Sequence, residues 1–197
     1  NEDITYLKSI GYEEDFLNYL KDLKFTGNIK SMQEGEICFG NEPLLRVEAP
    51  LIQAQLIETI LLNIINFQTL IATKASRIRQ IATHDTLMEF GTRRAQEIDA
   101  ALWGARAAFI GGFDSTSNVR AGKLFNIPVS GTHAHALVQT YGDEYIAFKK
   151  YAERHKNCVF LVDTFHTLKS GVPTAIKVAK ELGDTINFIG IRLDSGD

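Results

Sequence analysis

Four polar clusters in the second half of the chain contain the side chains best suited to chemistry. They occupy residues 90–94, 131–135, 163–167 and 192–197, and each follows a short apolar run. Cations can hold phosphates, carboxylates can bind Mg²⁺ or stabilise a cationic carbon, and histidine can accept a proton or a phosphoryl group. Together these groups predict a phosphorylated substrate. The ionisable residues of this region are Arg93, Arg94, His133, His135, Asp163, His166, Lys169, Arg192, Asp194 and Asp197.

The spacing of the clusters indicates a repeated βα unit. Thr132, Asp163 and Asp194 follow one another at intervals of 31 residues, and Phe90 lies 42 residues before Thr132. One βα unit takes about 30 residues. Because ligands bind at the carboxyl ends of parallel strands, we expect the four clusters to share one mouth.

The apolar pattern between the clusters predicts the elements that position them. Strands are expected at 87–90, 127–130, 159–162 and 186–191, and helices at 95–110, 118–125, 144–154 and 173–182. Strands separated by helices of this length form parallel sheets with right-handed crossovers, buried on both faces. We favour a β/α barrel over a doubly wound sheet because no strand is followed by a G-x-G-x-x-G turn.

The first part of the chain has a different texture. We expect two short helices before residue 25, short antiparallel strands at 36–39 and 43–47, and a long, mostly buried helix over 51–81 that starts after Pro50. These predictions divide the chain into residues 1–83, which end in the long helix, and residues 84–197, the first βα units of the barrel.

Composition excludes several classes of protein. The 197 residues are 45% hydrophobic and 23% charged, which is ordinary globular usage, and the net charge of −3 points to neither nucleic acid nor a membrane as partner. Cys38 and Cys158 show no disulfide or zinc spacing, and we expect a reducing, cytoplasmic location. No membrane span is expected, because Asn63 interrupts the longest apolar stretch, 60–65. The chain starts at Asn1 and ends in a polar turn, and we expect an internal piece of a longer protein.

The histidine pair leaves two interpretations open. His133 and His135 are two residues apart, so on an extended strand they would point the same way, yet each is as readily a hydrogen-bonded structural group as a catalyst. The spacing does not match H-E-x-x-H, and a zinc site is not favoured. No phosphate-binding G-x-x-x-x-G-K-[ST] loop and no G-x-S-x-G elbow occurs.

Five strings of the sequence, taken together and in order, resemble the nicotinate phosphoribosyltransferase family. They occupy residues 89–95 (EFGTRRA), 112–118 (GFDSTSN), 128–135 (PVSGTHAH), 161–171 (LVDTFHTLKSG) and 191–197 (IRLDSGD). The resemblance implies an α/β sandwich domain packed on an irregular β/α barrel, assembled as a homodimer. It assigns residues 1–83 to part of the sandwich domain, with the long helix as the connection to the barrel. It also implies the conversion of nicotinate and phosphoribosyl pyrophosphate to nicotinate mononucleotide and pyrophosphate. ATP hydrolysis is coupled to this step, with Mg²⁺ expected, in the salvage synthesis of NAD.

The resemblance also assigns roles to individual residues. His135 matches the histidine that ATP phosphorylates, Asp163 a carboxylate that orients it, and Asp194 an acid beside the ribose. Two further residues, Phe90 and Arg93, match an aromatic that stacks on the pyridine ring and a cation near the phosphates. The positions that match contacts to nicotinate are Thr132 and Arg192.

Ser117 distinguishes the nicotinate-using family from the closely related nicotinamide-using enzymes. The nicotinamide-using enzymes carry an aspartate at the matching position, which would repel a carboxylate, so the resemblance favours nicotinate over the amide. One departure concerns His166, because the family more commonly reads V-D-T-Y-D-T where this chain reads VDTFHT. The alternatives are a nicotinamide or quinolinate phosphoribosyltransferase, or a catalytically inactive binding module of the same fold.

Overall fold

The chain forms two compact units in a computed structural model that describes residues 2–195. The N-terminal unit spans residues 1–128 and the C-terminal unit residues 129–197. Gly196 and Asp197, the last residues of the fourth polar cluster, lie outside the described part.

The N-terminal unit is mainly helical, and the two short helices expected before residue 25 are confirmed. Its helices are α1 (Glu2–Ser9), α2 (Glu14–Lys21), α3 (Leu51–Ile81), α4 (Glu97–Ile110) and α5 (Val119–Phe125), with the 3-10 turn η1 (Thr92–Arg94). Its strands are β1 (Asn28–Ser31), β2 (Leu45–Glu48), β3 (Met88–Glu89) and β4 (Ser115–Thr116).

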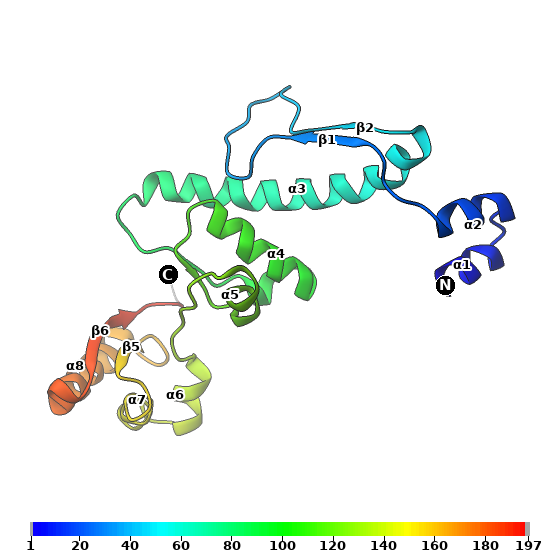
Figure 1. The fold of residues 1–197 in the computed structure, drawn as a ribbon. Helices are drawn as coiled ribbons and strands as arrows, with labels where there is room; N and C mark the ends of the chain where they lie inside the picture. Colours follow the sequence, from blue (N-terminus) through cyan, green and yellow to red (C-terminus); the bar gives the residue numbers. More distant parts are fainter. Residues whose placement is uncertain (1, 196–197) are drawn as a thin grey trace. The chain divides into compact units, whose positions relative to one another are not determined.

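Helix α3 has the predicted bounds and packs against α4 (Figure 1). Pro50 precedes it with a φ of −51°, which suits the start of a helix. The buried side chains of α4 are mostly alanines, so the two helices approach closely. At the end of α4, a Cβ added to Gly111 would lie only 2.5 Å from the carbonyl oxygen of Ala72.

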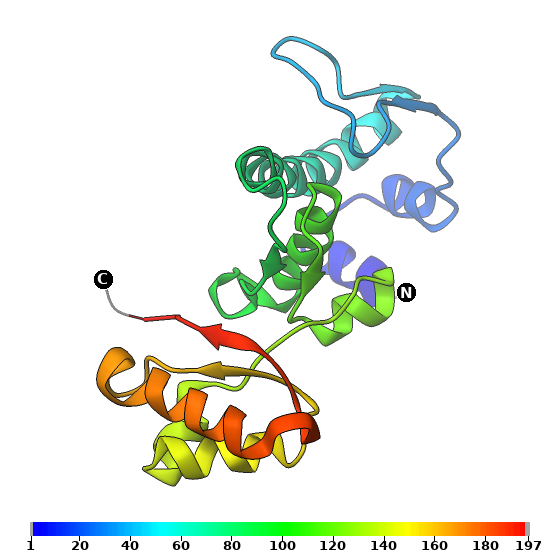
Figure 2. The ribbon, with the colours of Figure 1, turned by 90° about the vertical axis from the view of Figure 1, so that its left-hand side faces the viewer.

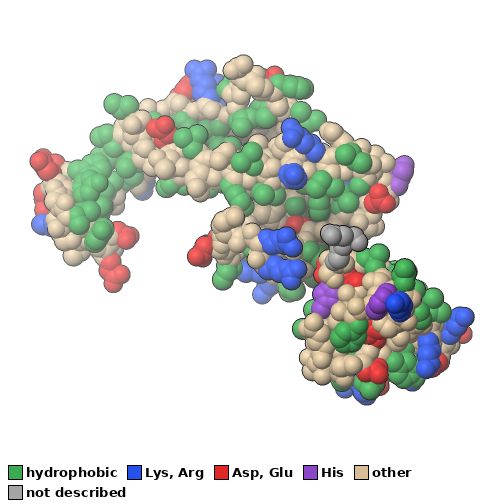
Figure 3. Space-filling view, turned by 180° about the vertical axis from the view of Figure 1, so that it is seen from behind, with side chains coloured by type: hydrophobic (Ala, Val, Ile, Leu, Met, Phe, Trp, Pro, Cys, Tyr) green, Lys and Arg blue, Asp and Glu red, His purple; other side chains and the backbone are tan. Residues whose placement is uncertain are grey.

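The expectation that α3 is mostly buried is wrong. Within the described structure, only Gln53 and Ala75 of this helix are buried. Its length and composition would let α3 cross a membrane, but core helices of soluble proteins pass the same test. The density of apolar residues was enough to predict a helix at this position, but the burial of that helix depends on which other elements pack against it. Figure 3 shows apolar side chains at the surface; the most exposed in α3 are Leu51, Ile60, Leu62, Leu70 and Ile81.

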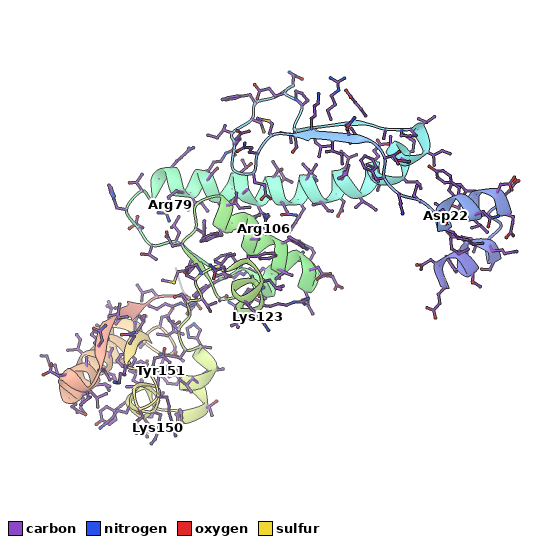
Figure 4. The ribbon with its side chains drawn as sticks, in the orientation of Figure 1. Asp22, Arg79, Arg106, Lys123, Lys150 and Tyr151 are labelled. Carbon is purple, nitrogen blue, oxygen red and sulfur yellow. The ribbon has the colours of Figure 1, made fainter. Side chains whose placement is uncertain are left out.

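The strands before α3 are antiparallel, as expected, but the first was misplaced. β1 lies at Asn28–Ser31 instead of 36–39, and its Ile29 pairs with Val47 of β2. The loop between them is held by Arg106 of α4, labelled in Figure 4. This guanidinium donates two hydrogen bonds to the Glu34 carboxylate, at 2.7 and 2.6 Å.

The C-terminal unit contains helices on a parallel strand pair. Its elements are α6 (His135–Tyr141), α7 (Glu144–Ala152), β5 (Asn157–Leu161), the π-helical turn η2 (Thr167–Gly171), α8 (Val172–Leu182), the 3-10 turn η3 (Gly183–Thr185) and β6 (Asn187–Arg192). The predicted helices and strands from residue 144 onward are confirmed to within a few residues. The strand expected at 127–130 is wrong, because only an isolated bridge forms at Val129. Neither α6 nor β4 was predicted.

Helices α7 and α8 cover one face of the β5–β6 pair (Figure 2). The core between them includes Phe148 and Phe160, whose rings stack with centroids 4.8 Å apart. The expectation of burial on both faces is wrong, because Ile189 and Ile191 on the other side of β6 are 63% and 42% exposed.

The mixed α/β class is confirmed, but a closed barrel is not seen among residues 2–195. The strands of this part form three two-stranded sheets, of which β3–β4 and β5–β6 are parallel.

Candidate active site

Three of the four polar clusters meet in the C-terminal unit, at the carboxyl ends of β5 and β6. Arg192, the last residue of β6, donates a hydrogen bond of 2.7 Å to the Thr132 hydroxyl. The same guanidinium forms an ion pair of 2.7 Å with Asp194. Packing thus brings together residues that are 60 positions apart in the sequence.

His135 opens α6 and presents its ring to this group. The Nδ1 atom lies 3.1 Å from the Thr164 hydroxyl oxygen. The Nε2 atom lies 3.5 Å from Asp194 Oδ2 and 3.9 Å from Asp163 Oδ1, and it is buried without a hydrogen-bond partner. Two carboxylates therefore face one ring nitrogen, while a hydroxyl contacts the other.

Asp163 ties the loop after β5 to the loop after β6. Its Oδ2 accepts hydrogen bonds from the backbone N–H groups of Asp194 and Ser195, at 2.6 and 2.5 Å, and from the Ser195 hydroxyl at 3.1 Å. Burial alone would raise the pKa of Asp163, but these hydrogen bonds keep the pKa below its ordinary value. Its Oδ1 is buried without a hydrogen-bond partner and faces His135.

Burial distinguishes His133 from His135. His133 is only 6% exposed, and its Nε2 accepts the backbone N–H of Leu161 at 3.0 Å. Its ring packs edge-on against Tyr151, which Figure 4 labels, at a centroid distance of 4.9 Å. Burial lowers the pKa of His133, and the neighbouring charges of Arg192 and His135 lower it further. His133 is a structural group that fastens residues 132–135 to the end of β5.

His166 lies at the start of η2. Its Nδ1 accepts the backbone N–H of Lys169 at 3.3 Å, so the ring caps this turn. A capping side chain therefore occupies the position at which this chain departs from the family pattern.

The remaining cluster, residues 90–94, lies in the N-terminal unit. It follows β3 and lies near Ser117, which follows β4. Phe90 directly follows β3, and Arg93 lies in η1. The backbone N–H of Ser117 donates to the Glu89 carbonyl at 3.0 Å, which brings the two loops together. A hollow of ≈ 410 Å³ beside η1 is lined in part by Thr92 and Asn118, the sequence neighbours of Arg93 and Ser117.

Arg79 of α3, labelled in Figure 4, joins the segments that carry β3 and β4. It donates to the carbonyl oxygens of Gly112, Ala82 and Asp85 at 2.7, 2.9 and 2.8 Å. It also forms an ion pair of 2.5 Å with Asp114, whose carboxylate accepts the N–H of Leu87 at 2.7 Å. Hydrogen bonds from Leu87 and Arg79 hold the pKa of Asp114 below its usual range.

Three residues in contact with the site were not predicted from the sequence. Thr164, Glu89 and Thr116 are polar neighbours of Asp163, Phe90 and Ser117. This adjacency, and their position within the strings that resemble the family, were the signals that could have found them. Among the residues that the structure describes, no three His, Cys, Asp or Glu side chains are arranged so that they could hold a metal ion.

Two family models match this chain. The "nicotinate phosphoribosyltransferase (NAPRTase) N-terminal domain" matches residues 1–66, and the "nicotinate phosphoribosyltransferase (NAPRTase) family" matches residues 86–197. The chain belongs to the nicotinate phosphoribosyltransferase family.

Relatives in this family align with the whole chain. A nicotinate phosphoribosyltransferase of Bacillus subtilis is 70% identical over 100% of the chain, which covers 40% of that protein. One from Mycobacterium tuberculosis is 40% identical over 100% of the chain, which covers 42% of that protein. The chain thus spans less than half the length of these relatives.

Solved structures show the same fold. The crystal structure of human nicotinic acid phosphoribosyltransferase matches with a TM-score of 0.88 and 31% identity, over 99% of this chain and 50% of that chain. A nicotinate-nucleotide pyrophosphorylase from Pyrococcus furiosus matches with a TM-score of 0.78 and 33% identity, over 87% of this chain and 43% of that chain.

Proposed function

We propose that the whole protein converts nicotinate and phosphoribosyl pyrophosphate to nicotinate mononucleotide and pyrophosphate, with coupled ATP hydrolysis, in NAD salvage. Family membership and the 70% identity to the Bacillus subtilis enzyme support this reaction. The observation that carries it is the position of His135, whose ring meets Thr164 on one side and two carboxylates on the other.

The surroundings of His135 suit a phosphoryl acceptor. Two carboxylates facing Nε2 favour a proton on that nitrogen, and the Thr164 hydroxyl then donates to Nδ1. Nδ1, which holds the ring's lone pair, attacks the terminal phosphorus of ATP in place of accepting the Thr164 hydrogen bond, ADP leaves, and water later cleaves the resulting P–N bond. Asp163 and Asp194 stabilise the imidazolium character that develops while the phosphoryl group is attached.

The neighbouring residues suit the rest of the reaction. The Arg192 guanidinium and the Thr132 hydroxyl, already in contact, offer donors for the nicotinate carboxylate. Asp194 supplies negative charge for the anomeric carbon as pyrophosphate leaves. In the N-terminal unit, Phe90 is assigned to the pyridine ring and Arg93 to the phosphates.

Ser117 is assigned to substrate choice. A serine offers a neutral hydroxyl where an aspartate would repel the substrate carboxylate, so nicotinate is preferred over nicotinamide. This assignment rests on the family pattern.

Asp163 and Asp194 also fit a Mg²⁺ ion carried in by substrate phosphates. The Oδ1 atom of Asp163 is a buried acceptor without a partner, and Mg²⁺ is often bound by one or two carboxylates plus phosphate oxygens. When bound, the ion would neutralise charge on the phosphates.

The same proposal extends to architecture. We propose that the whole protein completes an irregular β/α barrel beside a sandwich domain and forms a cytoplasmic homodimer. The division near residue 83 concerns those complete domains and stays a prediction.

The test uses the whole protein with each of three pyridines. Nicotinate should give its mononucleotide with the highest kcat/KM, and ATP should raise the yield. Preference for nicotinamide or quinolinate would replace this function with that of the corresponding enzyme. Absence of turnover together with absence of phosphoribosyl pyrophosphate binding in calorimetry would favour an inactive module.

His135→Ala is the decisive variant for the coupling step. It should lose the ATP stimulation completely, whereas His84→Gln, a substitution of an exposed histidine, should keep it. Full ATP-coupled turnover in His135→Ala would overturn the assigned role.

A further inference from the structure

We propose that Glu89 and Thr116 are positioning residues that set the discrimination between acid and amide substrates at Ser117. The inference rests on the proposed function, which places Phe90 and Ser117 at the pyridine ring. Glu89 and Thr116 act through the loops that carry those two residues, by fixing one loop against the other.

The strand pair that carries these loops is too short to hold them by itself. β3 and β4 have two residues each, and their ladder pairs Met88 with Ser115 and Glu89 with Thr116. Isolated pairs of strands are marginally stable even at ordinary lengths. Beside this ladder and the backbone hydrogen bond from Ser117 to Glu89, a side-chain interaction fixes the spacing of the loops that follow.

The Glu89 carboxylate supplies that interaction. Its Oε1 accepts the backbone N–H of Gly91, in the loop that carries Phe90 and leads to Arg93. Its Oε2 accepts the hydroxyl of Thr116 at 2.7 Å. One carboxylate therefore joins the loop after β3 to the end of β4.

Thr116 continues the connection on the other side. Its side chain is fully buried, and its hydroxyl oxygen accepts the backbone N–H of Asn118 at 3.0 Å. Asn118 in turn caps α5 by accepting the N–H of Ala121 at 3.0 Å. Ser117 lies between the two bonded residues, so its position depends on the Glu89–Thr116 hydrogen bond.

The connection suits a carboxylate. The Gly91 N–H and the Thr116 hydroxyl both donate to Glu89, one to each oxygen. Glutamine has the same shape but only one acceptor oxygen, so with that oxygen on the Gly91 N–H its amide would have to donate to the Thr116 hydroxyl and reverse that hydrogen bond. Glutamine should therefore weaken the connection, which the backbone hydrogen bond from Ser117 to Glu89 continues to support.

The lack of a side chain at Gly91 makes room for the Glu89 carboxylate. A Cβ added there would lie 2.8 Å from Glu89 Oε1, although the φ of −84° suits any residue. Alanine at this position would therefore displace the carboxylate without straining the backbone.

The test compares Thr116→Val, which keeps the shape and loses the hydroxyl, with Thr116→Ser, which keeps the hydroxyl, in the whole protein. Thr116→Val should raise KM for nicotinate about five- to tenfold and lower the nicotinate-to-nicotinamide ratio of kcat/KM. Thr116→Ser should stay within about twofold of the parent. Thr185→Val, at an exposed turn of the C-terminal unit, is the matched control.

Gly91→Ala should reproduce the loss of discrimination, Glu89→Gln should show a smaller loss, and hydrogen exchange at the Asn118 amide should accelerate in Thr116→Val. An unchanged nicotinate-to-nicotinamide ratio of kcat/KM in Thr116→Val would overturn the inference. This holds even if kcat and the melting temperature fall, because those losses would indicate a merely structural role. In either case a parent enzyme that forms nicotinate mononucleotide leaves the proposed function standing. If the parent forms none, the proposed function fails and this inference falls with it.

Discussion

The two units hold their candidate site residues by different means. In the C-terminal unit, His135 and Asp163 adjoin an apolar core that includes stacked Phe148 and Phe160. In the N-terminal unit, the loops near Phe90 and Ser117 follow strands of two residues. The buried side chains of the adjacent α4 are mostly alanines, and polar contacts of Arg79 and Glu89 hold the loops.

This difference suggests that one unit chiefly determines folding stability and the other chiefly determines substrate specificity. Burying large aromatic side chains stabilises a unit strongly, whereas a hydrogen-bond network contributes less energy but defines direction. We therefore expect substitutions in the C-terminal core to unfold the protein, and substitutions in the polar network of the N-terminal unit to alter substrate choice first.

The largest effect is expected for the aromatic core. Phe160→Ala should lower the free energy of unfolding by about 3–5 kcal/mol, because Phe160 is fully buried. Leu102→Ala, in the smaller core cluster of the N-terminal unit, should cost about 2 kcal/mol, the low end for such a change. Denaturant titration of the whole protein measures both. Phe39→Ala, a 73% exposed control, should have little effect, and equal losses at Phe160 and Leu102 would break the comparison.

A close backbone contact gives the next largest effect. A Cβ on Gly171 would lie 1.8 Å from the Val162 carbonyl oxygen, so Gly171→Ala must shift backbone and should cost about 1–3 kcal/mol or more. Gly111→Ala tests the counterpart between α3 and α4 in the N-terminal unit. Gly190→Ala, where no atom lies within 4 Å, is the control. Thermal melts that do not distinguish Gly171→Ala from Gly190→Ala would contradict the observed packing.

Thr164→Val should affect coupling more than folding. The variant removes the hydroxyl that contacts His135 Nδ1, a loss of about 1 kcal/mol that corresponds to about fivefold in ATP-stimulated kcat. Thr164→Ser should restore it. ATP-independent turnover serves as the internal reference, because a general loss of structure would lower both rates together.

The smallest expected effect is a loss of stability in mild acid, and it should be confined to the C-terminal unit. The pKa of His133 is lowered in the folded state, so the unfolded chain takes up the proton first, and stability falls as pH drops below the ordinary value of 6.5. The lowered pKa values of Glu14, Glu34 and Asp114 in the N-terminal unit matter only below about 4.5. The lowered pKa of Asp163 likewise acts only below 3.8.

Hydrogen exchange at pH 7.5 and 5.5, corrected for intrinsic rates, checks this difference. Protection should fall in residues 129–195 and stay constant in the N-terminal unit. In His133→Phe the pH dependence between these values should vanish, and its persistence would show that another group is responsible.

The sequence by itself determined the features that depend on local order. The dense apolar pattern after Pro50 was enough to place α3, because helical hydrogen bonds join residues four apart. Five sequence strings in order were enough to identify the family, and that resemblance named His135, Asp163, Asp194, Thr132 and Arg192 before their contacts were visible.

Tertiary structure decided everything that depends on partners far along the chain. β1 lies at residues 28–31 because its ladder forms with β2, and strand pairing is not encoded within one segment. Residue type and spacing did not separate His133 from His135, although the family resemblance named the second; the amide of Leu161, 28 residues away, makes the first a structural acceptor. The hydroxyl of Thr164 contacts the second across 29 residues. Spacing in the sequence predicts which side chains are candidates for the site, but only tertiary packing determines which atoms those side chains contact.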